Sequence, residues 1–483
     1  MENQQITENK ALNLFEALIP LLVLIALLIV NVLVFGDDAL SGSNQFVLLI
    51  GAAVAMIVGF WNKVSYEQML DGVADNFKST TGAILILLMV GALAGTWMIS
   101  GIIPTMIYYG LKMLNPAIFL PATVIICSII SLATGSSWTT SATVGIALVG
   151  IGKALGIPLG MTAGAVISGA YFGDKMSPLS DTTNLASAMA GADLFDHIRY
   201  MMLTTVPSIV ITIIIFAILS LTQDAAGTAQ TADMLSAIDA SINVTPMLFL
   251  VPIIVIIMIV KKTKPLIALF AGTILGGLFA LIFQGDVVAA ITGADSLTPK
   301  SAYMGVMDAI TRDVAITTPN ESLNDLFSSG GMNGMLGTIW LIMCAMVFGG
   351  IMEAIGALSR ISAALLSIAK SVFGLFAATV ASALSLNLTA SDQYLSIVVT
   401  GKMYEKAYQE KGLAPENLSR TIEDAGTVTS VLIPWNTCGA YQAGVLNVSV
   451  AEYFFYAIFN YLSPFMTLIF AALGIKIKQL VRK

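Results

Sequence analysis

The sequence has few charged residues, and this shortage excludes a water-soluble protein. Asp, Glu, Lys and Arg make up 11% of its 483 residues, whereas soluble domains carry about 25%. Hydrophobic residues reach 57% and the mean hydropathy is +0.88, so polar residues are too few to cover the apolar ones in water. Basic residues are not in excess either, since the net charge is −7, which excludes a nucleic-acid binder. We therefore expect an all-α protein that crosses a membrane several times.

Cysteine and histidine are almost absent as well. Cys127, Cys344 and Cys438 lie in apolar surroundings without C-x-x-C spacing, so they indicate neither a disulfide framework nor a zinc site. The one histidine, His197, cannot build a metal or haem site alone and reads as an interfacial residue, with pH sensing as the alternative. We therefore expect no cofactor and no catalytic set of an enzyme. The polar, acid-containing start at 1–16 is unlike a cleaved signal peptide.

Stretches without charged residues predict the membrane spans, because a charge at the bilayer centre costs about 2.5–3.5 kcal/mol. Two of these stretches, 79–111 and 113–152, are longer than the roughly 20 residues that cross a bilayer. Gly, Pro, Ser and Thr interrupt both, so each predicts two crossings or one crossing with a re-entrant hairpin. In all we expect about ten to fourteen helical elements. The clear single spans lie within 17–36, 42–61, 200–223, 245–260, 265–285, 334–352, 371–388 and 453–475.

Basic residues predict the orientation, because they favour the cytoplasmic side. The short loop Lys261–Lys264 and the tail with Lys476, Lys478, Arg482 and Lys483 should be cytoplasmic. We expect both termini on that side of a bacterial inner membrane. The segments 224–244 and 286–333 should face outward, and the latter is long enough for a short amphipathic helix.

Three short matches suggest an internal repeat, although similarity among Gly- and Ala-rich helices is the alternative. They pair 97–101 with 352–356, 146–150 with 397–401, and Ser177–Leu179 with Ser430–Leu432, at offsets of 255, 251 and 253. The charge pattern predicts opposite orientations for the two copies, and inverted repeats with broken helices are typical of secondary transporters. The expected parts are 1–78 with two spans, repeat 1 at 79–223, connecting spans and an outward loop at 224–333, repeat 2 at 334–475, and a basic tail at 476–483.

Polar residues gather at four places in otherwise apolar sequence, and the first is the hydroxyl-rich run 133–142. Its hydroxyls and a Gly predict an unwound segment whose oxygens replace the water shell of a small cation. The candidate ligands are Ser136, Ser137 and Thr139. The alternative is a Ser/Thr-rich helix interface, which is common in membranes.

The second place is 173–184, where Pro178 interrupts a helix. Asp181 is followed by Thr182, Thr183 and Asn184, and such hard oxygen donors suit Na⁺. A carboxylate in an apolar site binds either H⁺ or Na⁺, and this competition is a simple basis for exchange. We place a candidate Na⁺ site at Asp181, Thr182 and Ser137. Asp174 is a candidate proton carrier, with an interfacial pair to Lys175 as the alternative.

The remaining places are in the second half of the chain. Asp392, within 387–394, is predicted to stand opposite the hydroxyl-rich run, in register with Ser141, unless it belongs to an ordinary loop. Asn436 and Thr437 follow Pro434 and should line the site from the second repeat; a capped loop helix starting near Glu423 is the alternative.

Glu353 is a further candidate proton carrier, at the end of a predicted span. An interfacial pair with Arg360, seven residues further on, is equally compatible with its position.

Long motifs resemble a known family. Residues 168–185, 413–420 and 433–440 are similar to the signatures of NhaC-type Na⁺/H⁺ antiporters, and the resemblance covers roughly 15–475. It implies a bacterial inner-membrane transporter of the ion-transporter superfamily, with inverted repeats and helical hairpins. Members are often dimers, so a homodimer is also expected.

The residues and the resemblance together predict Na⁺/H⁺ antiport by alternating access, with Na⁺ and H⁺ as the exchanged ions. The family also contains malate/lactate-type members, so Na⁺- or H⁺-coupled exchange of a small carboxylate is the alternative. A channel needs rings of pore-lining residues from several chains, which the long asymmetric chain fits poorly.

Overall fold

The computed structural model describes residues 12–35, 39, 42–113, 115–223, 228–324 and 326–480. Within these ranges eight helices are long and apolar enough to cross a membrane, and two bent helix pairs raise the number to ten. The prediction of an all-α membrane protein is therefore confirmed. Arg482 and Lys483 of the predicted tail, and the first 11 residues, lie outside the described residues.

Most of the spans lie where the charge-free stretches predicted them. The clear single spans correspond to α1 (Leu14–Phe35), α2 (Ser43–Trp61), α10 (Leu194–Leu221), α13 (Pro265–Phe283), α18 (Leu336–Ala354) and α20 (Val372–Thr389). Two full crossings are excluded for 79–111. There α3 (Tyr66–Ile99) is one long helix, and α4 (Ile102–Met113) has 12 residues, which span about 18 Å.

The two remaining predicted spans, at 245–260 and 453–475, each belong to a bent helix pair. One consists of α11 (Thr228–Ser241), η3 (Pro246–Phe249) and α12 (Leu250–Val260), with a bend of 88°. The other consists of α24 (Val450–Tyr453), η6 (Phe454–Tyr456) and α25 (Ile458–Ala472), with a bend of 50°.

The outward segment predicted at 286–333 contains short elements only. They include the amphipathic helix that we expected there, α15 (Pro299–Thr311), which a Thr298 capping box begins. The other elements are α14 (Gly285–Ile291), α16 (Glu321–Asn324), α17 (Gly331–Gly334) and an antiparallel pair, β1 (Val314–Ala315) and β2 (Ser328–Ser329).

The stretch 113–152 forms one crossing and a returning arm. The first arm is α5 (Pro116–Thr134), and the second consists of α6 (Ser137–Thr140), the π-helical turn η2 (Ser141–Gly145) and α7 (Ile146–Ala154). The next helix, α8 (Leu159–Met176), packs along α5 in the same direction, since Gly169 faces Val124 and Gly173 faces Ser128. The chain between them must therefore return, so it reverses at Gly135–Ser136.

The second half of the chain has similar breaks. There α20 and α21 (Gln393–Glu410) meet at Ser391–Asp392. They are followed by α22 (Pro415–Ile422), the π-helical turn η4 (Glu423–Thr427), η5 (Ser430–Leu432) and, after a break at Pro434, α23 (Thr437–Leu446). In the first half the corresponding break at Pro178 separates α8 from α9 (Asp181–Ala190).

These breaks correct the sequence register of the two halves. Gly135 and Ser391 both have positive φ, 70° and 58°. The residues that follow them, Ser136 and Asp392, both cap the next helix. Asp392 therefore corresponds locally to Ser136, at an offset of 256, and not to Ser141 as the short sequence matches predicted. Whether the halves are inverted stays a prediction.

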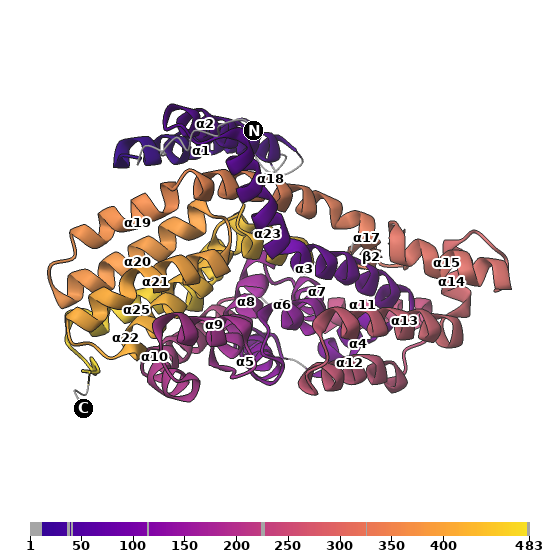
Figure 1. The fold of residues 1–483 in the computed structure, drawn as a ribbon. Coiled ribbons are helices and arrows are strands. Elements are labelled where there is room, and N and C mark those ends of the chain that lie inside the picture. The colour runs from indigo at the N-terminus through magenta and orange to yellow at the C-terminus, as the bar shows by residue number, and fades with distance from the viewer. Residues whose placement is uncertain are drawn as a thin grey trace.

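Figure 1 shows how these elements position the centre of the molecule. Helices α20 to α22, together with α19 (Ala357–Ser367), lie on the opposite side from α13 to α15, with α6, α7 and α8 between them. The pair α1–α2 lies at one end. The breaks of both halves therefore belong to the middle of the protein.

The α5–α8 contact yields a stability prediction. A Cβ on Gly173 would lie 2.4 Å from the Ser128 carbonyl oxygen, whereas a Cβ on Gly82 in α3 meets no atom within 4 Å. Because backbone cannot yield easily, we expect Gly173→Val to lower the free energy of unfolding by about 1–3 kcal/mol. The Gly82→Ala variant is the control, and unfolding in detergent micelles is the measurement. Equal stability of the two variants would contradict this packing.

Candidate functional site

The tip of the first hairpin holds a buried carboxylate. Gly135 ends α5 in the left-handed conformation, and Ser136 begins α6 by accepting a hydrogen bond from the Thr139 amide. The first helical residue, Ser137, donates its amide (3.0 Å) and its hydroxyl (2.7 Å) to Asp174 Oδ2. Asp174 is buried near the end of α8. The start of a helix thus faces an acid, an arrangement that favours negative charge.

The tip of the second hairpin is built similarly. Asp392 caps α21 by accepting a hydrogen bond from the Leu395 amide at 3.0 Å. Its other oxygen accepts a longer bond from the Thr437 hydroxyl at 3.4 Å. The Thr437 amide donates to the Ser391 carbonyl at 2.9 Å. These bonds hold the tip against the start of α23.

Amides secure the break before α23. Asn436 caps the helix by accepting from the Cys438 amide at 3.0 Å, and its Nδ2 donates to the Asn387 carbonyl at 3.0 Å. Asn387 in turn donates to the Gly426 carbonyl in η4 at 2.7 Å. All the side chains in this chain of contacts are buried, so the Pro434 break is a fixed feature.

An ion pair joins the two halves. Lys175 is fully buried at the end of α8, and its ammonium contacts Asp424 in η4. Asp424 also accepts hydrogen bonds from Thr204 of α10, at 2.9 Å, and from Thr467 of α25. Four elements therefore meet at this carboxylate. The alternative that Lys175 forms an interfacial pair with Asp174 is wrong.

Glu423, next to Asp424, is also fully buried. One of its oxygens accepts a hydrogen bond from the Thr182 hydroxyl at 3.2 Å. Its Oε2 has no hydrogen-bond partner among the described residues. A buried carboxylate oxygen without a donor is costly, so this atom is available to a cation or a proton.

An aromatic stack also joins the halves. The rings of Trp138 in α6 and Tyr441 in α23 lie 3.9 Å apart at an angle of 15°, and the Tyr441 hydroxyl donates to the Trp138 carbonyl at 3.0 Å. The hairpin of the first half is thus fixed to the broken helix of the second.

Five of the predicted site residues take part in three buried contacts. Ser137 meets Asp174, Asp392 meets Thr437, and Thr182 meets Glu423. The remaining hydroxyls bond locally: Thr139 to Ser136, and Thr183 to the Lys175 carbonyl.

Asp181 and Asn184 lie at the solvent-exposed side of this centre. Asp181 is the first residue of α9 and is exposed, yet it lies within electrostatic range of Asp174 and Tyr394. Asn184 is exposed too and donates to the carbonyls of Pro178 and Ser180, at 3.0 and 2.7 Å. Asp181 therefore lies at the edge of the buried centre and not within it.

Glu353 is exposed at the end of α18, and the described residues show no ion pair between it and Arg360. Sequence reasoning missed Lys175, Glu423 and Asp424 as site residues. The available indication was two adjacent acids within a long run poor in other charges. The pattern assigns the two acids no role beyond the start of the polar region, with a loop helix near Glu423 as the alternative, because their partners on α8, α10 and α25 are distant in sequence.

Comparisons with known proteins identify the family. Residues 169–475 match the Na⁺/H⁺ antiporter family. The chain is 39% identical over 430 residues to the Na⁺/H⁺ antiporter NhaC of Alkalihalophilus pseudofirmus, covering 89% of this chain and 90% of the relative. It is 36% identical over 424 residues to the NhaC of Bacillus subtilis, covering 87% and 90%.

A third relative is named for a different activity. The chain is 38% identical over 469 residues to the malate-2H⁺/Na⁺-lactate antiporter of Bacillus subtilis, covering 96% of this chain and 93% of the relative. With the multi-pass helical fold, these matches show that the chain belongs to the NhaC-type Na⁺/H⁺ antiporter family, a family of membrane transporters and not of enzymes.

Proposed function

We propose that the protein exchanges Na⁺ for H⁺ by alternating access across the bacterial plasma membrane, with both termini cytoplasmic. One observation carries the proposal: four carboxylates, Asp174, Asp392, Glu423 and Asp424, are buried where the hairpins and broken helices meet. The described contacts bring them a single basic side chain, Lys175. Because unpaired buried charge is costly, the excess negative charge has to be neutralised by bound cations or protons.

The proposed exchange is a competition for the same oxygens. Asp174 holds H⁺ or Na⁺, with the Ser137 hydroxyl as a further oxygen ligand, and Glu423 with Thr182 forms a second place for either ion. Asp181 attracts the cation at the entrance, together with Thr183 and Asn184. Lys175 neutralises Asp424 and so leaves Asp174 and Glu423 to the exchanged ions.

The other predicted residues complete the site in this proposal. Ser136 and Thr139 offer oxygens at the first tip, while Asp392, Asn436 and Thr437 line the site from the second half. Glu353 is left as an outlying proton carrier. Moving one hairpin and its broken helix relative to the rest would open the site first to one side and then to the other. The inverted arrangement of 79–223 and 334–475 and a homodimer remain part of this proposal.

Neutralising the acids tests this assignment. We expect Asp174→Asn to reduce Na⁺-driven proton movement in proteoliposomes to background, because the amide cannot take up a proton or balance a cation. Asp181→Asn should raise the apparent KM for Na⁺, because the exposed carboxylate attracts the cation without holding the exchanged proton. Asp193→Asn is the matched control, since Asp193 also starts a helix but caps α10 with exposed bonds. Exchange at the wild-type rate in Asp174→Asn, or an unchanged KM for Na⁺ in Asp181→Asn, with normal insertion, would refute the role of that residue.

The ion pair gives a separate stability prediction. Lys175→Gln leaves Asp424 buried without a counter-charge, so we expect the free energy of unfolding to fall by about 3–5 kcal/mol. Adding Asp424→Asn removes the uncompensated charge and should recover most of that loss. Unfolding in detergent micelles measures both. An unstable single variant that the second change does not rescue would show that Lys175 acts through packing alone.

A cavity favours the second candidate function, the coupled exchange of a small carboxylate. It has a volume of about 810 Å³ and lies between α3, α4, α7, α18 and α23, with Pro434 in its wall. This is the size of sites for organic ligands and exceeds the need of a bare cation. Lys153 lines it and has no ion pair among the described residues.

Uptake of labelled malate or lactate into proteoliposomes tests this second function. If a carboxylate is exchanged, Lys153→Gln should raise its KM while Lys153→Arg retains most of the affinity, because only the charge is needed. If neither acid is taken up under Na⁺ or pH gradients, the second function is refuted and Na⁺/H⁺ exchange remains as the proposal.

A further inference from the structure

A short segment in the basic tail is fastened to α22, the helix that continues into Glu423 and Asp424. Residues 476–480 run antiparallel to 412–414. The Ala414 amide donates to the Lys478 carbonyl at 3.0 Å, and the Leu480 amide donates to the Gly412 carbonyl at 2.7 Å. Asn417 of α22 donates to the same Lys478 carbonyl at 2.7 Å. We call residues 476–480 the strap.

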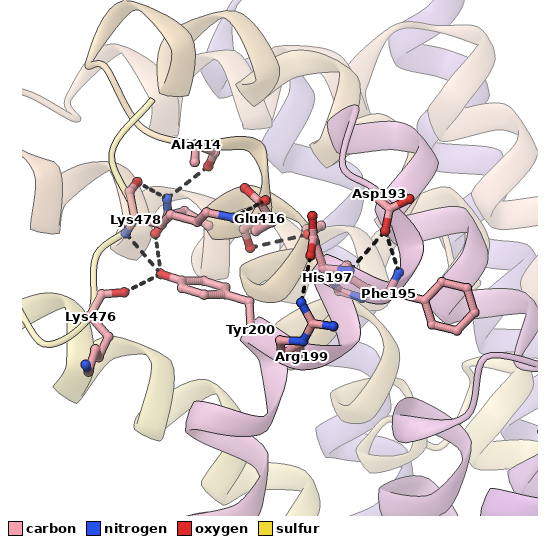
Figure 2. A network of polar contacts seen from close by, with 12 residues as sticks. Asp193, Phe195, His197, Arg199, Tyr200, Ala414, Glu416, Lys476 and Lys478 are labelled. Atoms are coloured by element: carbon pink, nitrogen blue, oxygen red, sulfur yellow. Dashed lines mark hydrogen bonds and ion pairs between the residues drawn. The ribbon is translucent and has the colours of Figure 1, made fainter. Parts of the chain in front are cut away.

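The strap also reaches α10, as Figure 2 shows. The Tyr200 hydroxyl of α10 lies 2.7 Å from the Lys476 carbonyl and 2.6 Å from Asn417 Oδ1, and the Lys478 amide donates to it at 3.4 Å. One phenol therefore joins α10, α22 and the strap. If α22 moves along α10, the hydrogen bonds of the Tyr200 hydroxyl must break, or the bonded groups must move together.

Arg420, in the last turn of α22, is the most unusual charge in the described part of the chain. It is fully buried, and Nε, Nη1 and Nη2 all lack a hydrogen-bond partner among the described residues. Its guanidinium lies 4.6 Å from the centre of the Tyr200 ring and 6.0 Å from that of Phe376. Such contacts contribute about 0.5–2 kcal/mol, far less than an uncompensated buried charge costs.

A carboxylate that can pair with Arg420 lies one helical turn away on the same helix. Glu416 precedes Arg420 by four residues, the spacing at which side chains meet on a helix. Its Oε1 contacts the Lys478 ammonium at 2.5 Å, while its buried Oε2 has no partner among the described residues. The hydrogen bond to Glu416 also raises the pKa of Lys478 above its ordinary value, so Lys478 stays charged. In this state Glu416 is paired with the strap, and the described residues show no hydrogen bond or ion pair between Glu416 and Arg420.

We propose that the strap is releasable and that transport requires its release. When Lys478 leaves, Glu416 turns to Arg420, and α22 is free to move along α10. Both the closed and the released state are accessible, because one ion pair replaces another. Release breaks the Glu416–Lys478 pair, in which 45% of the Lys478 side chain is exposed, and forms a buried pair between Glu416 and Arg420. Since α22 continues directly into Glu423 and Asp424, the strap sets the mobility of these acids; in this respect the inference rests on the proposed function.

A disulfide tests whether the strap must open. Leu413 and Gln479 are bridge partners without hydrogen bonds between them, a pair type with Cα atoms about 4.5 Å apart, which suits a disulfide. The native cysteines are buried. We expect oxidised Leu413→Cys/Gln479→Cys to exchange ions at least about tenfold more slowly than after reduction. Equal rates, with cross-linking verified by mass spectrometry, would overturn the proposal.

Thiol labelling gives a readout that does not depend on transport. Leu413 is 1% exposed and shares a hydrophobic cluster with Ile477 of the strap, so Leu413→Cys reacts with a maleimide only when the strap leaves. In this background Lys478→Gln should speed labelling up to about fivefold, and Arg420→Gln should slow it because the released Glu416 loses its partner. Lys476→Gln is the matched control, since only the carbonyl of Lys476 makes a contact.

The outcomes separate the two proposals. Labelling that Lys478→Gln and Arg420→Gln leave unchanged would show the strap to be a static contact, whatever the transport activity. Wild-type protein that moves no protons in response to Na⁺, but whose labelling follows the expected order, would retain the strap and refute Na⁺/H⁺ exchange.

Discussion

Burial of negative charge is the constraint on which this structure depends. Asp174, Asp392, Glu423 and Asp424 lie in the interior, and each carboxylate there has to be neutralised or hydrogen-bonded. The groups that contact these carboxylates are the N-termini of two helices, several hydroxyls and the Lys175 ammonium. The described contacts bring these carboxylates one basic side chain, Lys175, and this imbalance is what supports the proposed binding of cations or protons. A binding preference of this kind follows from electrostatics before any particular substrate is named.

Residues of both halves contribute to the contacts of these buried carboxylates. Lys175 and Thr182 of the first half contact Asp424 and Glu423 of the second, and Trp138 of the first half stacks on Tyr441 of the second. A proton or cation arriving at one acid therefore changes the energy of contacts that belong to both halves. In the proposed exchange, these contacts are what would link occupancy of the site to the relative position of the halves.

Much of the architecture could be predicted from the sequence, because its physical causes are local. Charge-free runs fix the spans, and Gly135, Pro178 and Pro434 mark the places where helices break. Asp392 could be placed at a tip, although five residues out of register, since short matches between apolar helices do not define an alignment. The ion pair of Lys175 and Asp424 could not be predicted, because it depends on the packing of elements that are far apart in the sequence. The exposure of Asp181 also follows from tertiary structure, namely from how the turn capped by Ser180 directs α9.

The glycine contacts between α5 and α8 have a consequence for motion. Backbone atoms of the two helices meet at Gly169 and Gly173, and neither helix has flexible side chains there that could accommodate sliding. The first hairpin and α8 must therefore travel as one rigid body that carries Asp174 and Ser137 with unchanged geometry. In the proposed exchange, displacement would fall to surfaces lined by longer side chains, and an ion held by Asp174 and Ser137 would keep these ligands while its access to either side of the bilayer changed.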